Sequence, residues 1–397
     1  MVYWPFGCAS DGREFEGSFA VSLSAAEAPF VVPSTSLSLF VSDISLLQFK
    51  NYSHREFRFT ERIVGICGRN GRGKTNLLDA VHYLCFTRSY FTRHDQNVPQ
   101  HGQQGFRLEG HFKLQGKEEK AVCILRETGR KEFSVNDQAY SRFSKHIGRY
   151  PCVVIAPDDV QLIIGGSEER RKFLDTLLSQ LDPAYLQHLI AYNKILQQRN
   201  SFLKNYGDGP SRDLSVLDIL DQQLLQEGVP LFEKRERFLM GFLADVKHLY
   251  NEIAQNYEPL ELIYDSELLG NDFAELLRFN RPKDLLIQRT SGGIHRDDLQ
   301  FGMGAQPFKA IASQGQRKSL LFALKLAELD VLKAEKHLTP LLLLDDVFEK
   351  LDEERIGNLL KRVSADEEAQ IFITDTNCAR LTGQLEGLKM PFQIIEL

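Results

Sequence analysis

The sequence predicts an α/β fold with an inserted all-helical lobe, and three segments carry this prediction. Residues 63–67 form a short apolar run, and a glycine-rich turn and a helical pattern follow it. The leucines 341–344 form a second apolar run, which is typical of a strand buried on both faces. Residues 168–255, in contrast, place their apolar side chains at helical spacing.

The chain begins with a segment unlike the rest. Residues 1–40 are rich in Ser and Ala and lack helical or strand periodicity, so we expect a disordered extension or an overlong gene start. From Ile44 to Phe59 the alternation of apolar residues predicts two edge strands. Residues 41–167 are therefore expected to form the N-terminal part of a head domain.

The glycine-rich turn fits the phosphate-binding pattern G-x-x-x-x-G-K-[ST]. Backbone N–H groups and the following helix N-terminus are expected to face the phosphates. Lys74 should reach the β/γ oxygens and assist catalysis, and Thr75 should hold Mg²⁺. The pattern predicts bound ATP or GTP, whereas the alternative is a coincidental glycine-rich turn. The residues expected around the nucleotide are Gly68, Arg69, Asn70, Gly71, Arg72, Gly73, Lys74, Thr75 and Asn76.

Beyond the turn, residues 105–137 and 151–156 predict further short strands. The helical lobe is then expected over 168–284, with its helices broken at Pro183, at 207–210 and at Pro230. The breaks leave no heptad run long enough for an extended coiled coil. Residues 285–397 should complete the head.

The second half of the nucleotide site is expected where the leucine run ends. Asp345 and Asp346 follow it directly, and the carboxyl ends of such strands are where α/β folds place ligand groups. Asp345 is the expected Mg²⁺ carboxylate, and Asp346 is expected to orient the attacking water. Two aspartates that merely end a strand are the alternative.

Composition narrows the protein class. With 43% hydrophobic and 26% charged residues the chain resembles ordinary globular proteins, and no apolar run approaches the ~20 residues of a membrane span. The net charge of −6 does not favour polyanion binding by the whole surface, so DNA contact would need a local basic patch. The six cysteines are scattered, which predicts reduced thiols in a cytoplasmic protein without disulfides or zinc.

A third motif indicates how the site is completed. Ser313 and Gln316 lie in an S-x-G-Q sequence before a long helix, which resembles the signature motif of ABC-type ATPases. The resemblance implies that Ser313, with Gln316, acts in trans on the γ-phosphate held by a second subunit. Asp352 matches the D-loop of that class, and residues 374–376 stand where its H-loop lies but contain no histidine.

The whole of 41–397 resembles the RecF family of bacterial recombination mediators. The resemblance implies ATP binding, an ATP-dependent homodimer, DNA binding at single-stranded or gapped sites, and RecR and RecO partners. It also implies a role in loading recombinase and in the SOS response. Two departures are Glu349–Lys350, where a small residue and Glu are expected, and residues 1–40, which have no counterpart. The matching segments are 47–52, 68–76, 169–175, 293–299 and 343–348.

From this resemblance we expect a slow, DNA-stimulated ATPase that works as a switch, since Asp346 is shorter than the glutamate of fast ABC ATPases. Alternatives are another SMC- or Rad50-like or ABC-type ATPase, a transporter subunit, or a small-molecule kinase. The 238 residues from Thr75 to Ser313 (313 − 75) disfavour a transporter subunit, whose interval is expected to be shorter.

Several other residues are candidates with a structural alternative. Lys50 is expected to contact ATP phosphates or to be a solvated loop lysine. The cluster from His295 to Asp298 is interpreted as a coupling between lobes or as an internal salt-bridge network. The candidates for DNA contact, each with a solvated face as the alternative, are Arg88, Tyr90, Phe91, Arg93, Lys194, Arg199 and Lys204.

Overall fold

The structure is a computed structural model and describes residues 39–206, 214–254, 258–347, 353–365 and 368–397, which lie in one compact unit. Residues 1–38, most of the predicted extension, lie outside the described residues. So do the turn at 207–210, Glu349, Lys350 and Asp352. Leu39 and Phe40 already belong to the first strand.

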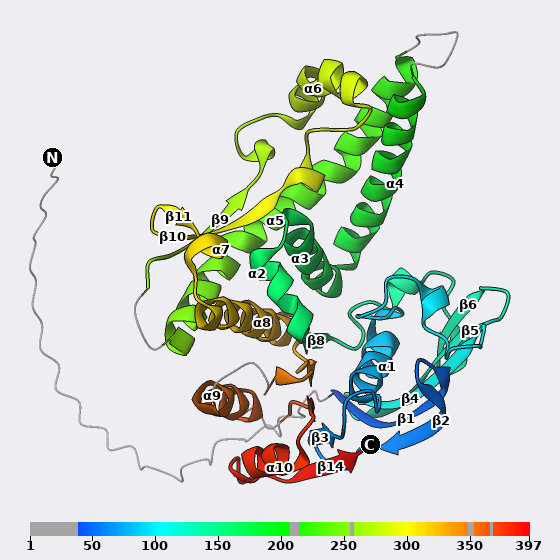
Figure 1. Ribbon diagram of the computed structural model, residues 1–397. Coiled ribbons are helices and arrows are strands. Elements are labelled where there is room, and N and C mark those ends of the chain that lie inside the picture. The colour runs from blue at the N-terminus through cyan, green and yellow to red at the C-terminus, as the bar shows by residue number, and fades with distance from the viewer. Residues whose placement is uncertain (1–38, 207–213, 255–257, 348–352, 366–367) are drawn as a thin grey trace, which may run out of the picture. The chain divides into compact units, whose positions relative to one another are not determined.

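A five-stranded parallel sheet forms the centre of the head (Figure 1). Its order is β14-β3-β13-β12-β8, and every neighbouring pair is parallel. The predicted strands β3 and β12 are confirmed, and all of their residues are buried. The strands are β3 (Ile63–Cys67), β8 (Cys152–Ile155), β12 (Leu341–Leu344), β13 (Ile371–Asp375) and β14 (Phe392–Glu396).

A six-stranded antiparallel sheet of order β2-β1-β4-β5-β6-β7 packs on the other side of helix α1 (Lys74–Phe86). Because α1 contacts strands of both sheets, nearly all of its residues are buried. The prediction of two edge strands was wrong for β1, which pairs with β2 on one side and with β4 on the other. The strands are β1 (Leu39–Phe49), β2 (Tyr52–Arg58), β4 (Phe106–Leu114), β5 (Lys117–Leu125), β6 (Lys131–Val135) and β7 (Gln138–Ala139).

The helical segment contains α3 (Ser167–Leu181), α4 (Pro183–Asn205), α5 (Ser215–Ala254) and α6 (Phe273–Ile287), and α4 packs along α5 (Figure 1). Pro183 separates α3 from α4 as predicted, because a proline fits the first turn of a helix. The predicted break at Pro230 was wrong, because Pro230 lies inside α5, which is a continuous helix of 40 residues. Burial of Leu224, Leu231 and Leu239 offsets the local cost of the proline, which is about 3 kcal/mol.

The segment after α5 links both regions. Strands β9 (Leu260–Asp265), β10 (Asp298–Met303) and β11 (Gln306–Pro307) form a sheet of order β11-β10-β9, so strand pairing crosses the predicted boundary at 284/285. The remaining helices are α2 (Gln161–Ile164), α7 (Phe308–Ile311), α8 (Gln314–Lys336), α9 (Glu353–Ser364) and α10 (Cys378–Glu386).

The expectation of reduced thiols throughout was wrong, because Cys67 and Cys378 form a disulfide. Their distance of 311 residues in sequence gave no local signal, but β3 and β13 are neighbours, so the segment after β13 returns to Cys67. Cys85, Cys123 and Cys152 are free and buried. Within the described ranges, no helix is both long enough and apolar enough to cross a bilayer.

Candidate functional site

The phosphate loop connects β3 to α1 and begins directly at the end of the strand. Gly73 caps the helix with φ 108°, a conformation that favours glycine. A Cβ at this position would stand 2.7 Å from side-chain atoms of Asn51 and Tyr52, so the close approach also requires glycine. The helix N-terminus therefore opens on the loop, as phosphate binding requires.

Lys74 is the first residue of α1 and is almost fully buried. Its Nζ donates to the carbonyl oxygen of Gly68 at 2.9 Å and reaches that of Arg69 at 3.4 Å. The ammonium group is thus held across the loop by the carbonyl oxygens of its first two residues.

Thr75 and Asp345 are brought together from positions 270 residues apart. The Thr75 hydroxyl contacts the Asp345 carboxylate oxygens at 2.9 and 3.0 Å. Burial raises the pKa of Asp345, and the hydrogen bonds from Thr374 and Thr75 oppose this shift. A hydroxyl and a carboxylate are hard oxygen donors of the kind that Mg²⁺ selects, so these residues fit the expected ion.

Asp346 follows in the left-handed conformation, with φ 44°. Its N–H donates to the Thr374 hydroxyl at 2.8 Å. Asp345 and Asp346 line a cavity of about 260 Å³ together with the first turns of α8, which contribute Gln314, Arg317 and Lys318. The two aspartates are therefore adjacent in the structure to the helix that carries the signature motif.

Ser313 is the N-cap of α8, as the motif predicts, and its side chain is exposed. Its hydroxyl accepts from Gln316 N–H at 3.2 Å, and its own N–H donates to Gln316 Oε1 at 2.7 Å. Gln316 Nε2 donates to Glu258 at 3.0 Å. The Gln316 amide is thus used in capping and in a contact with the segment before β9, while Ser313 remains open to solvent.

Lys50 is not a free loop lysine in this structure. Its Nζ lies 2.5 Å from Asp79, a fully buried carboxylate on α1, and 5.6 Å from the centre of the Phe91 ring. The contact with ATP phosphates stays a prediction, and it would have to compete with this ion pair.

Sequence reasoning missed several residues that support the loop. The Asn51 amide donates to Arg72 O at 3.1 Å, and the Tyr52 hydroxyl donates to Gly73 O at 3.0 Å. Asp375 O accepts from Gly68 N–H at 3.3 Å. Asn51 and Tyr52 lie at the end of the recognised segment 47–52, so their position was the available signal.

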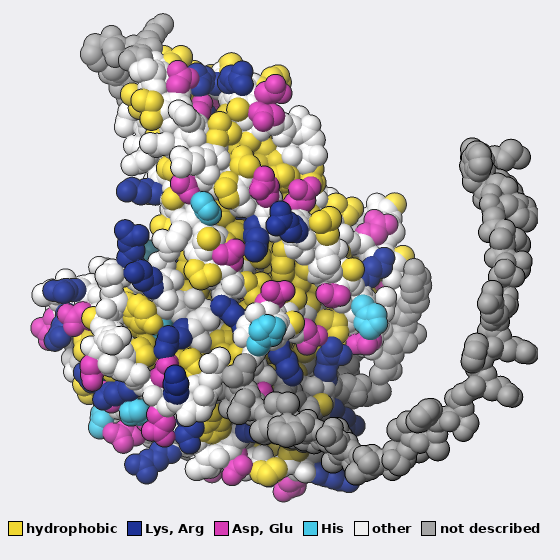
Figure 2. Space-filling model, turned by 180° about the vertical axis from the view of Figure 1, so that it is seen from behind, with side chains coloured by type: hydrophobic (Ala, Val, Ile, Leu, Met, Phe, Trp, Pro, Cys, Tyr) yellow, Lys and Arg dark blue, Asp and Glu magenta, His cyan; other side chains and the backbone are white. Residues whose placement is uncertain are grey.

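Two of the candidates for DNA contact bind carboxylates of the protein itself. Arg199 is fully buried and its guanidinium pairs with Asp221 and Asp284 at 2.6 and 2.7 Å. The Tyr90 hydroxyl donates to Asp159. Arg199 is not available for DNA, because its guanidinium is buried and paired with two buried carboxylates, and the Tyr90 hydroxyl is engaged by a partly buried one. On the face shown in Figure 2, Lys and Arg are interspersed with Asp and Glu.

The cluster from His295 to Asp298 is an internal network. Arg235, which is buried, contacts Asp297 at 2.8 Å and Asp175 at 2.7 Å. Asp298 pairs with Arg170 of α3 at 2.6 Å. The cluster thus fastens α3 and α5 to the loop before β10, which agrees with the salt-bridge alternative.

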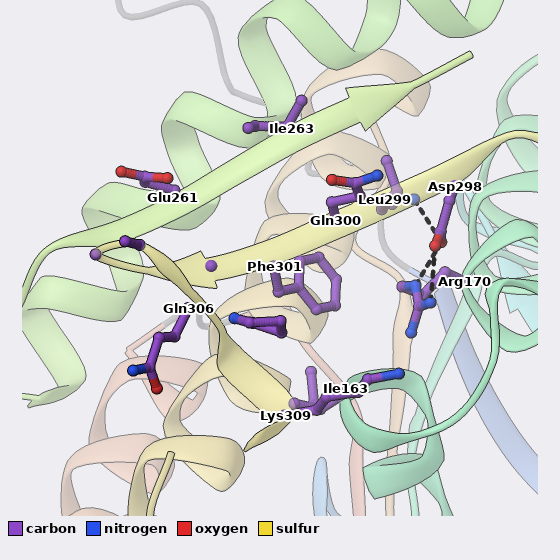
Figure 3. A pocket seen from close by; sticks show the side chains of 14 residues that line it. Ile163, Arg170, Glu261, Ile263, Asp298, Leu299, Gln300, Phe301, Gln306 and Lys309 are labelled. Atoms are coloured by element: carbon purple, nitrogen blue, oxygen red, sulfur yellow. Dashed lines mark hydrogen bonds and ion pairs between the residues drawn. The ribbon is translucent and has the colours of Figure 1, made fainter. Parts of the chain in front are cut away.

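A separate cavity of about 520 Å³ lies beside β10 (Figure 3). Phe301 points into it, and the Arg170 guanidinium lies 5.7 Å from the centre of this ring. Lys309 of α7 lines the same cavity. Neither the phosphate loop nor Asp345 and Asp346 line this cavity.

Comparisons with known proteins show the family to which the chain belongs. The family model described as the RecF/RecN/SMC N terminal domain matches residues 40–390. A protein of Flavobacterium johnsoniae named DNA replication and repair protein RecF is 38% identical, over 90% of this chain and 100% of the relative. A protein of the same name from Cytophaga hutchinsonii is 40% identical, over 85% of this chain and 89% of the relative. A solved structure described as the recombination mediator protein RecF with ATP in the RecFOR pathway superimposes with TM-score 0.80 at 29% identity, over 87% of this chain and 94% of that one.

Proposed function

The chain belongs to the RecF family of DNA replication and repair proteins, and from that premise we propose that it is an ATP-dependent DNA-binding recombination mediator. It acts in recombinational repair and at replication forks, helps to load recombinase and supports the SOS response. ATP binds at the phosphate loop of one subunit, and Ser313 of a second subunit completes the site. The observation that carries this proposal is the convergence of Lys74, Thr75 and Asp345 at the N-terminus of α1.

The closed state is a homodimer with nucleotide between the subunits. Each nucleotide contacts the loop of one subunit and the α8 N-terminus of the other, so ATP binds the dimer better than the monomer and shifts the population toward it. The exposed, capped Ser313 supports this arrangement, because its hydroxyl and the helix N-terminus face outward.

Hydrolysis is slow and serves to open the dimer. Mg²⁺, held by Thr75 and Asp345, would supply charge neutralisation at the phosphates. Asp346 orients the attacking water, and the bond from its N–H to Thr374 fixes the backbone from which it acts. We infer that DNA accelerates this slow hydrolysis, so that the ATPase works as a timed switch.

DNA and protein partners bind to the closed dimer. The net charge of −6 and the mixed charge on the face in Figure 2 do not favour general polyanion binding, so contact with single-stranded or gapped DNA requires a local basic patch. RecO- and RecR-type proteins are the proposed partners, since the similar structure is described within the RecFOR pathway. The proposed location is the cytoplasm.

Sedimentation of the protein with Mg²⁺–ATP, with and without gapped DNA, tests the proposal. The wild type should dimerise with ATP and cosediment with DNA, whereas Lys74→Met should fail to bind ATP. Ser313→Arg should bind ATP as a monomer but not dimerise. Normal ATP-dependent dimerisation of Ser313→Arg would contradict the composite site, and an ATPase rate per subunit independent of protein concentration would favour a monomeric kinase.

A further inference from the structure

The disulfide between Cys67 and Cys378 lies at the base of the phosphate loop. Cys67 is the last residue of β3 and directly precedes Gly68, the first residue of the loop. Cys378 is the first residue of α10. The bond therefore joins the start of the loop covalently to the helix that follows β13.

Backbone hydrogen bonds next to the disulfide also connect the start of the phosphate loop to neighbouring segments. Gly68 N–H donates to Asp375 O at 3.3 Å, and Leu397 N–H donates to Cys67 O at 2.9 Å. Thr374, which directly precedes Asp375, donates to the Asp345 carboxylate at 2.8 Å. The segment from Thr374 to Cys378 thus connects the disulfide to the expected metal carboxylate.

We propose that the Cys67–Cys378 pair is a thiol–disulfide switch that sets the affinity of the site for ATP, with the disulfide form binding more tightly. This inference rests on the proposed function of the loop as an ATP site. The disulfide holds Gly68 and the Thr374–Cys378 segment in the arrangement that the phosphates need, so less ordering remains to be done on binding. After reduction, Gly68 keeps its hydrogen bond to Asp375, but the preceding Cys67 is no longer covalently bonded to α10.

The exposure of the two cysteines determines which sulfur an external thiolate attacks when the disulfide is reduced. Cys67 is fully buried, whereas Cys378 is partly exposed, so an external thiolate attacks Cys378 Sγ. The S–S bond breaks, the Cys67 sulfur leaves with the electron pair and takes up a proton, and the second thiol of a dithiol reductant then displaces Cys378. Two thiols are formed and the dithiol is oxidised to its own disulfide.

Hydrogen peroxide forms the disulfide again from the two thiols. The Cys378 thiolate attacks a peroxide oxygen and gives a sulfenic acid and water once a proton is taken up. The Cys67 sulfur then displaces the hydroxyl group from Cys378, and a second water forms. In a reducing compartment, disulfides that do form are commonly redox-sensing, so this pair would tighten ATP binding under the oxidising conditions that also damage DNA.

The test measures ATP affinity by isothermal titration of the full-length protein in two states: oxidised, with the bond verified by mass spectrometry, and reduced by dithiothreitol. The oxidised form should bind about three- to tenfold more tightly, the range expected for partial preorganisation of one loop. Cys378→Ser should match the reduced wild type in either condition. Cys123→Ala, which removes a free buried thiol of β5, should keep the full redox response.

Equal affinity of the two wild-type states would overturn the switch and leave the proposed function intact, and this comparison needs no variant to fold. A Cys378→Ser protein that still responds to dithiothreitol would overturn it as well. If neither state binds ATP, the proposed function itself fails together with the switch.

Discussion

The Thr374 hydroxyl links the two aspartates at the end of β12. It donates to Asp345 Oδ1 at 2.8 Å and accepts from Asp346 N–H at 2.8 Å. Thr374 is fully buried, so its bond to Asp345 forms away from water, whereas the bond from Asp346 is partly buried. One side chain of β13 thus fixes the carboxylate expected to hold Mg²⁺ and the backbone of the residue expected to orient water.

Replacing Thr374 by valine should therefore slow ATP hydrolysis more than it weakens ATP binding. The variant keeps the shape but leaves a buried carboxylate oxygen and a backbone N–H without the hydroxyl, at a cost of about 1–3 kcal/mol of unfolding free energy. We expect kcat to fall about tenfold, because one such bond corresponds to roughly 1.4 kcal/mol. Steady-state ATPase assays and urea unfolding check this. Thr374→Ser keeps the hydroxyl and should recover most of the rate; equal losses in both variants would contradict the assignment.

Tyr52 should act on the nucleotide through the loop. Its hydroxyl donates to Gly73 O, and burial raises its pKa to about 12, so it remains a neutral donor at ordinary pH. Tyr52→Phe loses this bond and should lower ATP affinity about two- to fivefold, with about 1 kcal/mol of stability lost. Isothermal titration with ATP measures the effect. Tyr140→Phe is the matched control and should bind normally, because Tyr140 directly follows β7 at the opposite edge of the same sheet and its hydroxyl lies 3.4 Å from His146 Nδ1. Unchanged affinity in Tyr52→Phe would show that the loop holds its shape without this hydroxyl.

The parts of the site that could be predicted are those encoded locally. Strand β3, the glycine-rich turn and the start of α1 follow one another in sequence, and the Ser313 cap lies three residues from Gln316. The parts that could not be predicted depend on distant partners. Thr374 meets Asp345 only because β13 pairs with β12, and Cys67 meets Cys378 across 311 residues.

The same reason explains the wrong predictions in the helical region. Pro230 is a local breaking signal, yet packing of its helix against α4 outweighs it. Arg199 carries a charge that usually faces solvent, yet Asp284 and Asp221 compensate it inside the lobe. Neither partner could be identified from the residues around these positions.

Arg235 should be essential for the stability of the network that joins α3 and α5 to the loop before β10. Because Asp297 is buried beside it, Arg235→Met would leave an uncompensated carboxylate and should cost about 3–5 kcal/mol of unfolding free energy. Urea unfolding followed by circular dichroism measures this loss. Arg130→Met removes an arginine whose side chain is 79% exposed, and it should change stability by less than about 0.5 kcal/mol. Similar losses for both variants would contradict the central position of Arg235.

His146 should make the protein less stable as the pH falls. It is fully buried with Nε2 2.8 Å from Leu84 O, and burial lowers its pKa from 6.5 to about 4. Between these values the unfolded chain binds a proton that the folded protein does not, so unfolding becomes easier on acidification. The contribution of neutral His146 to the free energy of unfolding is fully present above about pH 6.5 and is lost progressively as the pH falls toward 4.

From pH 7 to pH 5 this histidine alone should remove about 2 kcal/mol of unfolding free energy, since each pKa unit corresponds to about 1.4 kcal/mol. Urea unfolding of the wild type and of His146→Gln at both pH values isolates the effect, because the variant loses the titrating ring and should show a smaller drop between them. The exposed His101 offers the control: His101→Gln should lose as much stability on acidification as the wild type. If His146→Gln shows the same drop as the wild type, the proton uptake belongs to other groups.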